Sequence, residues 1–393
     1  MGAAAATRSR VRGDIVRIIH RGLGLPDLAR TIGRSLNTAV PFEGTCLLTV
    51  DPATLLPTGE IVENGLPPTA RGRLTEIELG EPDFNKFTTL ARAAVPAASL
   101  SAATSGDLDR SLRQREIRRP SGFADELRTV LADATGSWAT LTLLRETRRP
   151  NFTPTDVRFV ASLTPILAEG VRRATLAGDA GDAGDGDRSD TGFLVLGADD
   201  AVELTNPAAE QWIDELSPLG PPTEALPAAI RAVVAQARRI AAGDRNVLAS
   251  ARVRTRAGRW LVVRGSPAGP DQVAVLLEAA RPAELAAAIA DAYGFTERER
   301  TITALVARGL PTTEIAHRLH LSAYTVQDHL KAIFDKSGTS SRGELVSRLF
   351  FDHHVDRLGG GAEAPVTAER TLAGADRGDR CRRRARLCGM PSP

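Results

Sequence analysis

The sequence has 393 residues, of which 42% are hydrophobic and 25% are charged, and its formal net charge is +2. This composition is typical of a globular protein with two or three domains. Because the chain as a whole is not a polycation, any surface for nucleic acid must be local. No run of about 18 apolar residues is present, and the N-terminus lacks the apolar stretch of a secretory signal. We therefore expect a cytoplasmic protein with no membrane partner.

The cysteine content supports the same compartment. The chain has three cysteines, Cys46, Cys381 and Cys388. A sparse, odd set argues against a disulfide framework and for a reducing environment.

Helix and strand patterns in the first part of the chain predict an α+β domain over residues 14–176. The preceding residues 1–13 are expected to be disordered. Its closing helix begins at Pro154, with Thr153 as N-cap, and ends near residue 175. The Ala-, Ser- and Arg-rich segment 95–122 is expected to be a mobile loop. Apolar runs bounded by turn residues predict strands at 45–50, 60–63, 126–131 and 138–144.

Residues 177–191 have the Gly- and Asp-rich composition of a linker. Their spaced aspartates suggest calcium. An EF-hand loop, however, needs the pattern D-x-D-x-D-G and a Glu at its twelfth position, and neither is present. We therefore expect no metal site.

A second α+β domain is predicted over residues 192–280. Asn206 and Pro207 mark the start of a helix over 208–216, and a longer helix is expected over 224–242. Two strands, then helices, then a three-stranded meander indicate a sensor-type fold. The strands are expected at 193–196, 202–205, 248–255, 259–265 and 272–278.

The last folded part, residues 281–355, is predicted to be all helix. A connecting helix covers 282–293, and short helices follow at 297–307, 313–319, 323–336 and 341–350. The basic segment 356–393 is expected to be disordered.

Capping signals delimit these short helices. Thr296 is a predicted N-cap of the first, which ends at Gly309. Either Thr312 or Thr313 is expected to cap the second. Ser322 is expected to cap the third, after a turn at residues 320–322. Ala316 matters because two helices joined by a short turn cross steeply only if the residue at their contact is small.

The third helix has an apolar face and a polar face. Val326, Leu330, Ile333 and Phe334 recur at three- and four-residue spacing and predict the buried face. Gln can bond adenine, Asp can accept from cytosine, and Lys can reach guanine or phosphate. The residues left exposed are Ala323, Tyr324, Gln327, Asp328 and Lys331, with Thr325 near the start of the helix.

The spacing of these residues resembles the LuxR-type helix-turn-helix of bacterial regulators. That resemblance implies that the third helix enters the major groove and the fourth helps to form a dimer. It implies these roles for Gln327, Asp328 and Lys331, and for Leu345. The resembling elements are Thr296-x-Arg298-Glu299, Gly309, Glu314-Ile315-Ala316, Leu321-Ser322, Thr325-Val326, His329-Leu330, Ile333, Lys336, Gly338 and Ser341-Arg342-x-Glu344-Leu345.

Two features of this segment weaken the electrostatic attraction to DNA. The family often has Lys or Arg at one of the positions held here by Gln327 and Asp328. Residues 281–355 also contain nine Lys and Arg against nine Asp and Glu. Binding from charge alone is therefore expected to be weak, and dimerisation or the arginine-rich tail would have to compensate.

The two N-terminal domains resemble sensor families. The order of elements and the segment NFTPTDVRFVASL at 151–163 are similar to a GAF domain. The segment FLVLGADDAVELTNPAAEQW at 193–212, with the strands that follow, is similar to a PAS domain. Both families bind small ligands in some members and only relay or dimerise in others. The ligand, if one exists, cannot be named from the sequence.

The residues and motifs that these two domains lack argue against several kinds of catalytic and metal site. No histidine lies between residues 21 and 316, so a His-ligated haem or zinc site is not expected there. Cys46 lies in an apolar strand and is expected to be a buried, inert thiol. No P-loop is present, and no pair of acidic residues is placed as general acid and base. We therefore expect no cofactor and no enzymatic activity.

The sequence thus predicts a DNA-binding transcription regulator with double-stranded DNA, a second copy of the chain and RNA polymerase as expected partners. The alternatives are a signalling scaffold or an enzyme that uses the C-terminal helices for protein docking, and a helical bundle that no longer binds DNA. Arg342, at the start of the fourth helix, is expected to clamp the DNA backbone. The predicted DNA-binding residues are Thr312, Thr313, Ser322, Tyr324, Thr325, Gln327, Asp328, Lys331 and Arg342.

Overall fold

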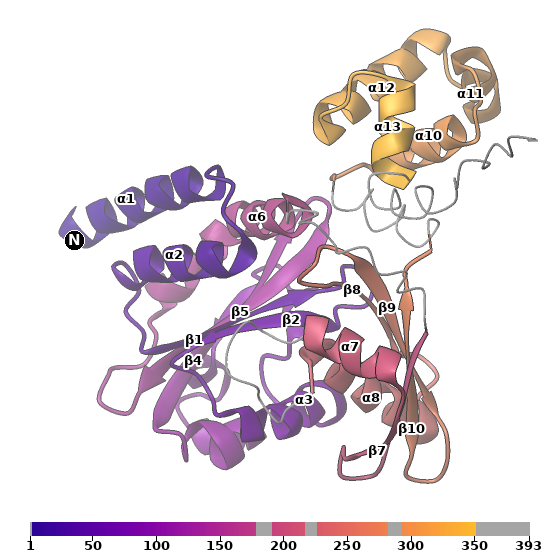
Figure 1. The fold of residues 1–393 in the computed structure, drawn as a ribbon. Helices are drawn as coiled ribbons and strands as arrows, with labels where there is room; N and C mark the ends of the chain where they lie inside the picture. The colour runs from indigo at the N-terminus through magenta and orange to yellow at the C-terminus, as the bar shows by residue number, and fades with distance from the viewer. Residues whose placement is uncertain (1, 178–190, 217–225, 282–292, 351–393) are drawn as a thin grey trace, which may run out of the picture. The chain divides into compact units, whose positions relative to one another are not determined.

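The computed structural model describes residues 2–177, 191–216, 226–281 and 293–350 (Figure 1). The predicted linker, connecting helix and C-terminal tail lie almost wholly outside these ranges. Within the described ranges, no helix is long and apolar enough to cross a membrane.

The first domain is built on an antiparallel sheet of five strands in the order β2-β1-β5-β4-β3. All four predicted strands are present, and each is longer than predicted. The short strand β3 was not predicted. The two longest strands, β4 and β5, pair along almost their whole length. The strands are β1 (Gly44–Val50), β2 (Pro57–Glu63), β3 (Ala97–Ser99), β4 (Phe123–Asp133) and β5 (Gly136–Glu146).

The two faces of this sheet differ because successive side chains of a strand point to opposite sides. Leu47 and Leu143 lie on the face that packs against α1 (Gly2–Ile19), α2 (Leu25–Asn37) and α6 (Pro154–Ala177) in one apolar core (Figure 1). Cys46 and Arg128 lie on the other face. Leu74 of α3 (Arg71–Gly80) and Phe87 of α4 (Phe87–Leu90) line a cavity on that side, and a short helix α5 (Leu100–Ala103) follows β3.

The prediction that residues 1–13 are disordered was wrong, because α1 begins at Gly2. Its first turns are rich in alanine, the residue that favours helix most. Val11 and Ile15 are buried in the apolar core. Arg8 forms an ion pair with Asp156 at 2.8 Å and so ties this helix to α6.

The prediction of a mobile loop at 95–122 was also wrong. This segment forms β3, α5, a short 3-10 helix at Leu108–Arg110 and a single π-helical turn at Gln114–Arg118. Partners distant in sequence hold it: Arg113 forms ion pairs with Asp83 and with Glu126, and all three side chains are buried. Sequence patterns within the segment do not indicate these partners, because both lie outside it.

The second domain has an antiparallel sheet in the order β7-β6-β10-β9-β8, as the predicted meander implies. Asn206 caps α7, since its Oδ1 accepts from the Ala209 amide at 2.9 Å. Gly265 lies so close to α8 that an added Cβ would approach Val233 Cγ1 to 2.7 Å. The elements are β6 (Gly192–Leu196), β7 (Val202–Thr205), α7 (Pro207–Leu216), α8 (Ala228–Ala241), β8 (Ser250–Arg254), β9 (Trp260–Pro267) and β10 (Val273–Ala279).

The C-terminal domain consists of short helices whose bounds agree with the predicted ones to within one residue. Its apolar core unites all of them: Ile302, Ile315, Val326, Ile333 and Leu345 are buried together. The helices are α10 (Glu297–Ala307), α11 (Thr312–Leu319), α12 (Ala323–Ser337) and α13 (Arg342–Phe350).

The predicted cap of α10 is confirmed and extends into an ion pair. Thr296 and Glu299 form a capping box, in which Glu299 Oε2 accepts from the Thr296 amide at 2.7 Å. The same oxygen accepts from Lys336 Nζ at 2.6 Å, which joins the end of α12 to the start of α10. Burial works to raise the pKa of Glu299. The bonds from Lys336 and Thr296 outweigh burial, so the pKa lies below its usual value.

We predict that Lys336→Met destabilises the C-terminal domain at neutral pH by about 1–2 kcal/mol, because it leaves the buried Glu299 carboxylate without its cation. A carboxyl group with a lowered folded-state pKa stabilises the fold above its unfolded-state pKa, and this contribution is lost as the pH falls through the folded-state pKa. Hydrogen exchange of the α10 amides in the full chain, measured against pH, reports the difference.

Lys331→Met is the matched control. Lys331 lies on the same helix but is exposed, with no ion pair among the described residues. Equal loss of protection in both variants, or a difference that persists at acidic pH, would contradict the role given to the Glu299–Lys336 pair.

Candidate nucleic-acid interface

The rotation of α12 about its axis is set by the residues that it buries. Val326 and Ile333 are fully buried, and Leu330 is nearly so. On the opposite face, Tyr324 is 72% exposed. The predicted phase of this helix is therefore confirmed. Also exposed on α12 are Ala323, Gln327, Asp328 and Lys331, whereas Thr325 is half-buried.

The turn between α11 and α12 is short and closely bonded. Ala316 is buried at the contact between these helices, and its carbonyl accepts from the Leu321 amide at 2.9 Å. His320 ends α11 in the left-handed conformation, with φ 53° and ψ 45°. That conformation is uncommon for residues other than glycine, although histidine adopts it more readily than most. The turn at residues 320–322 was predicted, but its left-handed residue was not.

The start of α12 carries two hydroxyl groups. Ser322 is its N-cap, as predicted, and accepts from the Thr325 amide at 3.0 Å. The two hydroxyls are also hydrogen-bonded to each other at 2.8 Å. Because the N-terminal end of a helix carries a partial positive charge, this end of α12 suits an anionic group such as a phosphate.

The start of α11 differs from the prediction. Neither Thr312 nor Thr313 is the N-cap, because Pro311 occupies that position and Thr312 is already the first helical residue. The Thr312 hydroxyl instead accepts from Arg342 Nη2 at 2.7 Å. Thr313 is exposed.

Arg342 is engaged inside the domain. Besides its bond to Thr312, its Nη1 donates to the Leu310 carbonyl at 2.8 Å, and the side chain is half-buried. It thus fastens the beginning of α13 to the segment between α10 and α11. The sequence offered no signal for these contacts, because the partners lie about thirty residues away.

The family resemblance implied that Leu345 helps to form a dimer, but the structure gives this residue a different role. Its side chain is fully buried in the core of its own domain, together with Ile302 and Val306. It is therefore not available to pack against a second copy. A dimer contact on α13 would have to use other residues.

The exposed face of α12 carries two opposite charges, those of Asp328 and Lys331. Among the described residues, neither Asp328 nor Lys331 has a hydrogen bond or an ion pair through its side chain. Both side chains are therefore free to reach an external partner.

Across all the residues that the structure describes, no group of three or more His, Cys, Asp or Glu side chains is arranged to hold a metal ion.

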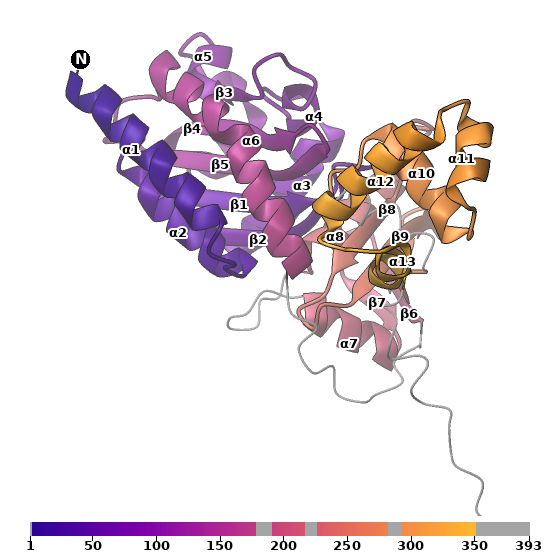
Figure 2. The ribbon, with the colours of Figure 1, turned by 90° about the horizontal axis from the view of Figure 1, so that it is seen from above.

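The helix α12 lies against both α10 and α11 (Figure 2). Its exposed side chains lie opposite the buried Val326 and Ile333. The arrangement brings together Ser322, Tyr324, Thr325, Gln327, Asp328 and Lys331 on one helix. Thr312 and Arg342 are instead hydrogen-bonded to each other, where the start of α11 meets the start of α13.

Comparison with known proteins bears on this domain most strongly. Residues 294–349 match the profile of the family "Bacterial regulatory proteins, luxR family". A segment of 52 residues is 44% identical to Response regulator Rre1 from Synechocystis sp.; it covers 13% of this chain and 22% of that relative. The chain thus spans less than a quarter of this curated relative.

Solved structures give weaker likenesses. The VqsR LBD domain from Pseudomonas aeruginosa is 16% identical, with a TM-score of 0.29, over 44% of this chain and 97% of that one. SdiA from Escherichia coli is 11% identical, with a TM-score of 0.30, over 86% of this chain and 95% of that one. At such TM-scores neither similarity supports a conclusion about the fold or function of this chain. The family match, together with the confirmed helices, turn and caps, identifies residues 294–349 as a helix-turn-helix domain of the luxR family of bacterial regulatory proteins.

Proposed function

We propose that this protein is a sequence-specific DNA-binding transcription regulator, with α12 as the helix that enters the major groove. The observation that supports this most is the exposed polar face of α12, opposite the buried Val326, Leu330 and Ile333. The short turn after α11 projects that face from the domain, as recognition by a helix-turn-helix requires.

The three side chains on this face have complementary chemistry. The Gln327 amide can donate to and accept from adenine, and the Asp328 carboxylate can accept from the cytosine amino group. Lys331 lies one turn further along and can reach guanine or a phosphate oxygen. Ser322 and Thr325, at the positive end of the helix, are placed to contact the DNA backbone.

The proposed regulator acts as a homodimer. Attraction to any DNA sequence depends on how many phosphates the protein neutralises, and among the described residues the polar face of α12 offers one unpaired cation, Lys331. Two copies double that number and read two half-sites about 10 base pairs apart, or a multiple of this. RNA polymerase is a further proposed partner.

The two sheet domains are proposed to modulate this activity in the manner of GAF and PAS sensors. A ligand or partner that binds one arrangement of the domains more tightly than another would shift their equilibrium. The operator can be found by selecting bound sequences from a random DNA pool with the full chain.

We predict that Lys331→Ala weakens binding to all DNA sequences alike, because it removes a cation that neutralises phosphate. The slope of log affinity against log salt should fall by about 1 per binding domain. Fluorescence anisotropy with selected and scrambled duplexes at several salt concentrations measures this. Arg298→Ala, which removes an exposed cation from α10 instead, is the control and should leave the slope unchanged.

We predict that Gln327→Ala relaxes sequence choice at one base pair and costs about 1–3 kcal/mol with the selected operator, while affinity for scrambled DNA stays nearly the same. Repeating the random-pool selection with the variant shows which position loses its preference. If the selected sequence is identical for variant and parent, Gln327 does not read bases.

Asp328→Asn should have the opposite charge effect from Lys331→Ala. It removes an anion that repels phosphate, so binding to scrambled DNA should strengthen and become steeper in salt, while preference at one position declines. An Asp328→Asn variant with weaker binding to every sequence would place this residue outside the DNA contact.

A protein-docking role for the helices predicts a different result. In that case none of the three α12 substitutions would alter binding to DNA, and the full chain would select no sequence from the pool.

A further inference from the structure

The first domain contains a cavity on the charged face of its sheet, beside α3. Its volume is about 80 Å³, and it is lined by apolar groups that include Leu48, Val62, Leu66 and Leu74. Cys46, from the centre of β1, also faces it, and burial raises the pKa of this thiol to about 11. A water molecule needs roughly 10–15 Å³ of such space, so the cavity has room for a small organic molecule.

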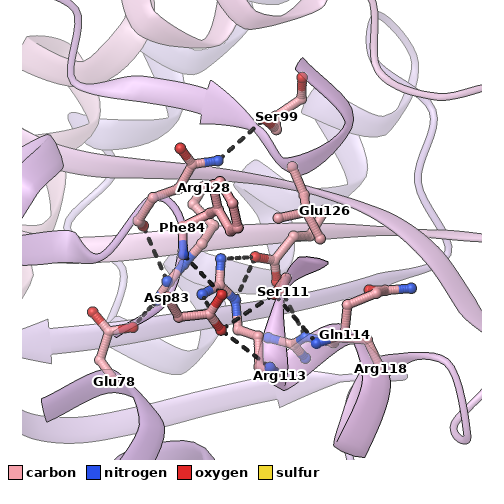
Figure 3. Close-up of polar contacts among 12 residues, drawn as sticks. Glu78, Asp83, Phe84, Ser99, Ser111, Arg113, Gln114, Arg118, Glu126 and Arg128 are labelled. Atoms are coloured by element: carbon pink, nitrogen blue, oxygen red, sulfur yellow. Dashed lines mark hydrogen bonds and ion pairs between the residues drawn. The ribbon is translucent and has the colours of Figure 1, made fainter. Parts of the chain in front are cut away.

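A buried ionic cluster lies next to this cavity (Figure 3). Arg113 forms ion pairs on two sides, at 3.0 Å from Asp83 and 2.5 Å from Glu126, although among the described residues neither Nη1 nor Nη2 has a well-aligned hydrogen-bond partner. Arg128 pairs with Glu78 at 2.6 Å and stacks over the Phe87 ring at 3.7 Å. These arginines therefore have their counter-charges inside the domain.

In the described part of the chain, Arg118 differs from these two arginines because the one carboxylate that it contacts is shared. It is only 3% exposed, yet its sole ion pair is formed by Nε with Glu126 at 3.2 Å, and Arg113 shares that carboxylate. Within the described residues, no hydrogen bond reaches Nη1 or Nη2 of Arg118. Burial is the main cause that lowers the pKa of this guanidinium, and the neighbouring arginines act in the same direction.

A buried cation with unsatisfied donors is costly unless something pairs with it. Arg118 lines the cavity, so a guest there can reach it. Because Nε already bonds Glu126, the two terminal amino groups remain as a fork, and a carboxylate matches that fork with two parallel bonds.

We propose that this cavity binds a small organic acid whose carboxylate pairs with Nη1 and Nη2 of Arg118 and whose apolar body packs against Leu48, Val62 and Leu74. Arg71, Arg128 and, from α8 of the second domain, Arg231 also line the cavity. Each of them is paired: Arg71 with Glu60 at 2.5 Å, Arg128 with Glu78 at 2.6 Å, and Arg231 with Glu60 at 2.9 Å. They orient the guest, while Arg118 recognises its charge. The volume limits the acid to a short aliphatic chain or a single ring.

This inference deepens the proposed function, because it names the class of ligand that would act on the first domain. Its test needs no DNA. The full chain is titrated by calorimetry with hexanoate, benzoate and phenylacetate, and with the corresponding uncharged amides, which have the same shape. A second readout is the alkylation rate of Cys46, followed by mass spectrometry of its peptide, since a guest in the cavity shields this thiol.

The expected result is that at least one acid binds and protects Cys46, and that its amide binds at least about tenfold more weakly. Arg118→Gln should weaken binding of the acid by about 10- to 100-fold. Arg145→Gln is the matched control, because Arg145 is a buried arginine of the same domain that does not line the cavity, and it should bind as the parent does.

If Arg118→Gln does not fold, Leu48→Phe replaces it, since this change fills the cavity and keeps every charge; it should abolish binding and protection. Equal binding of acid and amide, parental binding by the folded Arg118→Gln variant, or no binding of any of the acids would overturn the inference. Arg118→Gln should still bind the operator, so that loss of acid binding with intact DNA binding separates this proposal from the function of α12.

Discussion

The candidate site depends on the burial of three side chains of α12. Val326, Leu330 and Ile333 enter the core that unites the helices of the C-terminal domain. Because successive residues of a helix are separated by about 100°, fixing these three fixes the direction of all the others. Gln327, Asp328 and Lys331 face solvent for this reason and not through contacts of their own. A substitution that rotated α12 would therefore displace the whole polar face at once.

The same domain uses two of its cations to hold itself together. Lys336 is committed to Glu299, and Arg342 is committed to Leu310 and Thr312. Both fasten the ends of helices on which the orientation of α12 depends. Counting contacts within the described ranges alone, Lys331 is the unpaired cation on the exposed face of α12. Such a surface attracts DNA weakly, so base contacts and the pairing of two copies must contribute a large share of the proposed affinity.

What could be predicted from the sequence follows from how local each signal is. The bounds of the C-terminal helices came out within one residue because Thr296, Gly309 and Ser322 act on the adjacent turn. Contacts between distant residues gave no such signal. Thr312 looked like a cap, and its hydroxyl serves Arg342 instead. Leu345 looked like an interface residue, and it is core.

The first domain illustrates the same limit on a larger scale. The segment 95–122 has a composition typical of loops, because its stabilising partners, Asp83 and Glu126, lie outside it. The first part of α1, before Asp14, was missed because its residues carry little apolar periodicity. It is extended by alanine and anchored by Arg8 to Asp156, whose position near the other end of the domain the sequence does not reveal.

The buried arginines link the architecture of the first domain to its proposed regulation. A sheet whose two faces were both apolar would be easier to stabilise than one that buries Arg113, Arg118 and Arg128. Two of these cations repay part of that cost through close ion pairs. Arg118 repays less, since it shares the Glu126 carboxylate with Arg113 and, in the part of the chain that the structure describes, its Nη1 and Nη2 donate no hydrogen bond. A domain that carries an incompletely paired charge gains stability when an anion completes the pairing. Occupancy of the cavity and order of the surrounding elements are then linked thermodynamically, which gives a small acid a physical means to shift the equilibrium of a regulator.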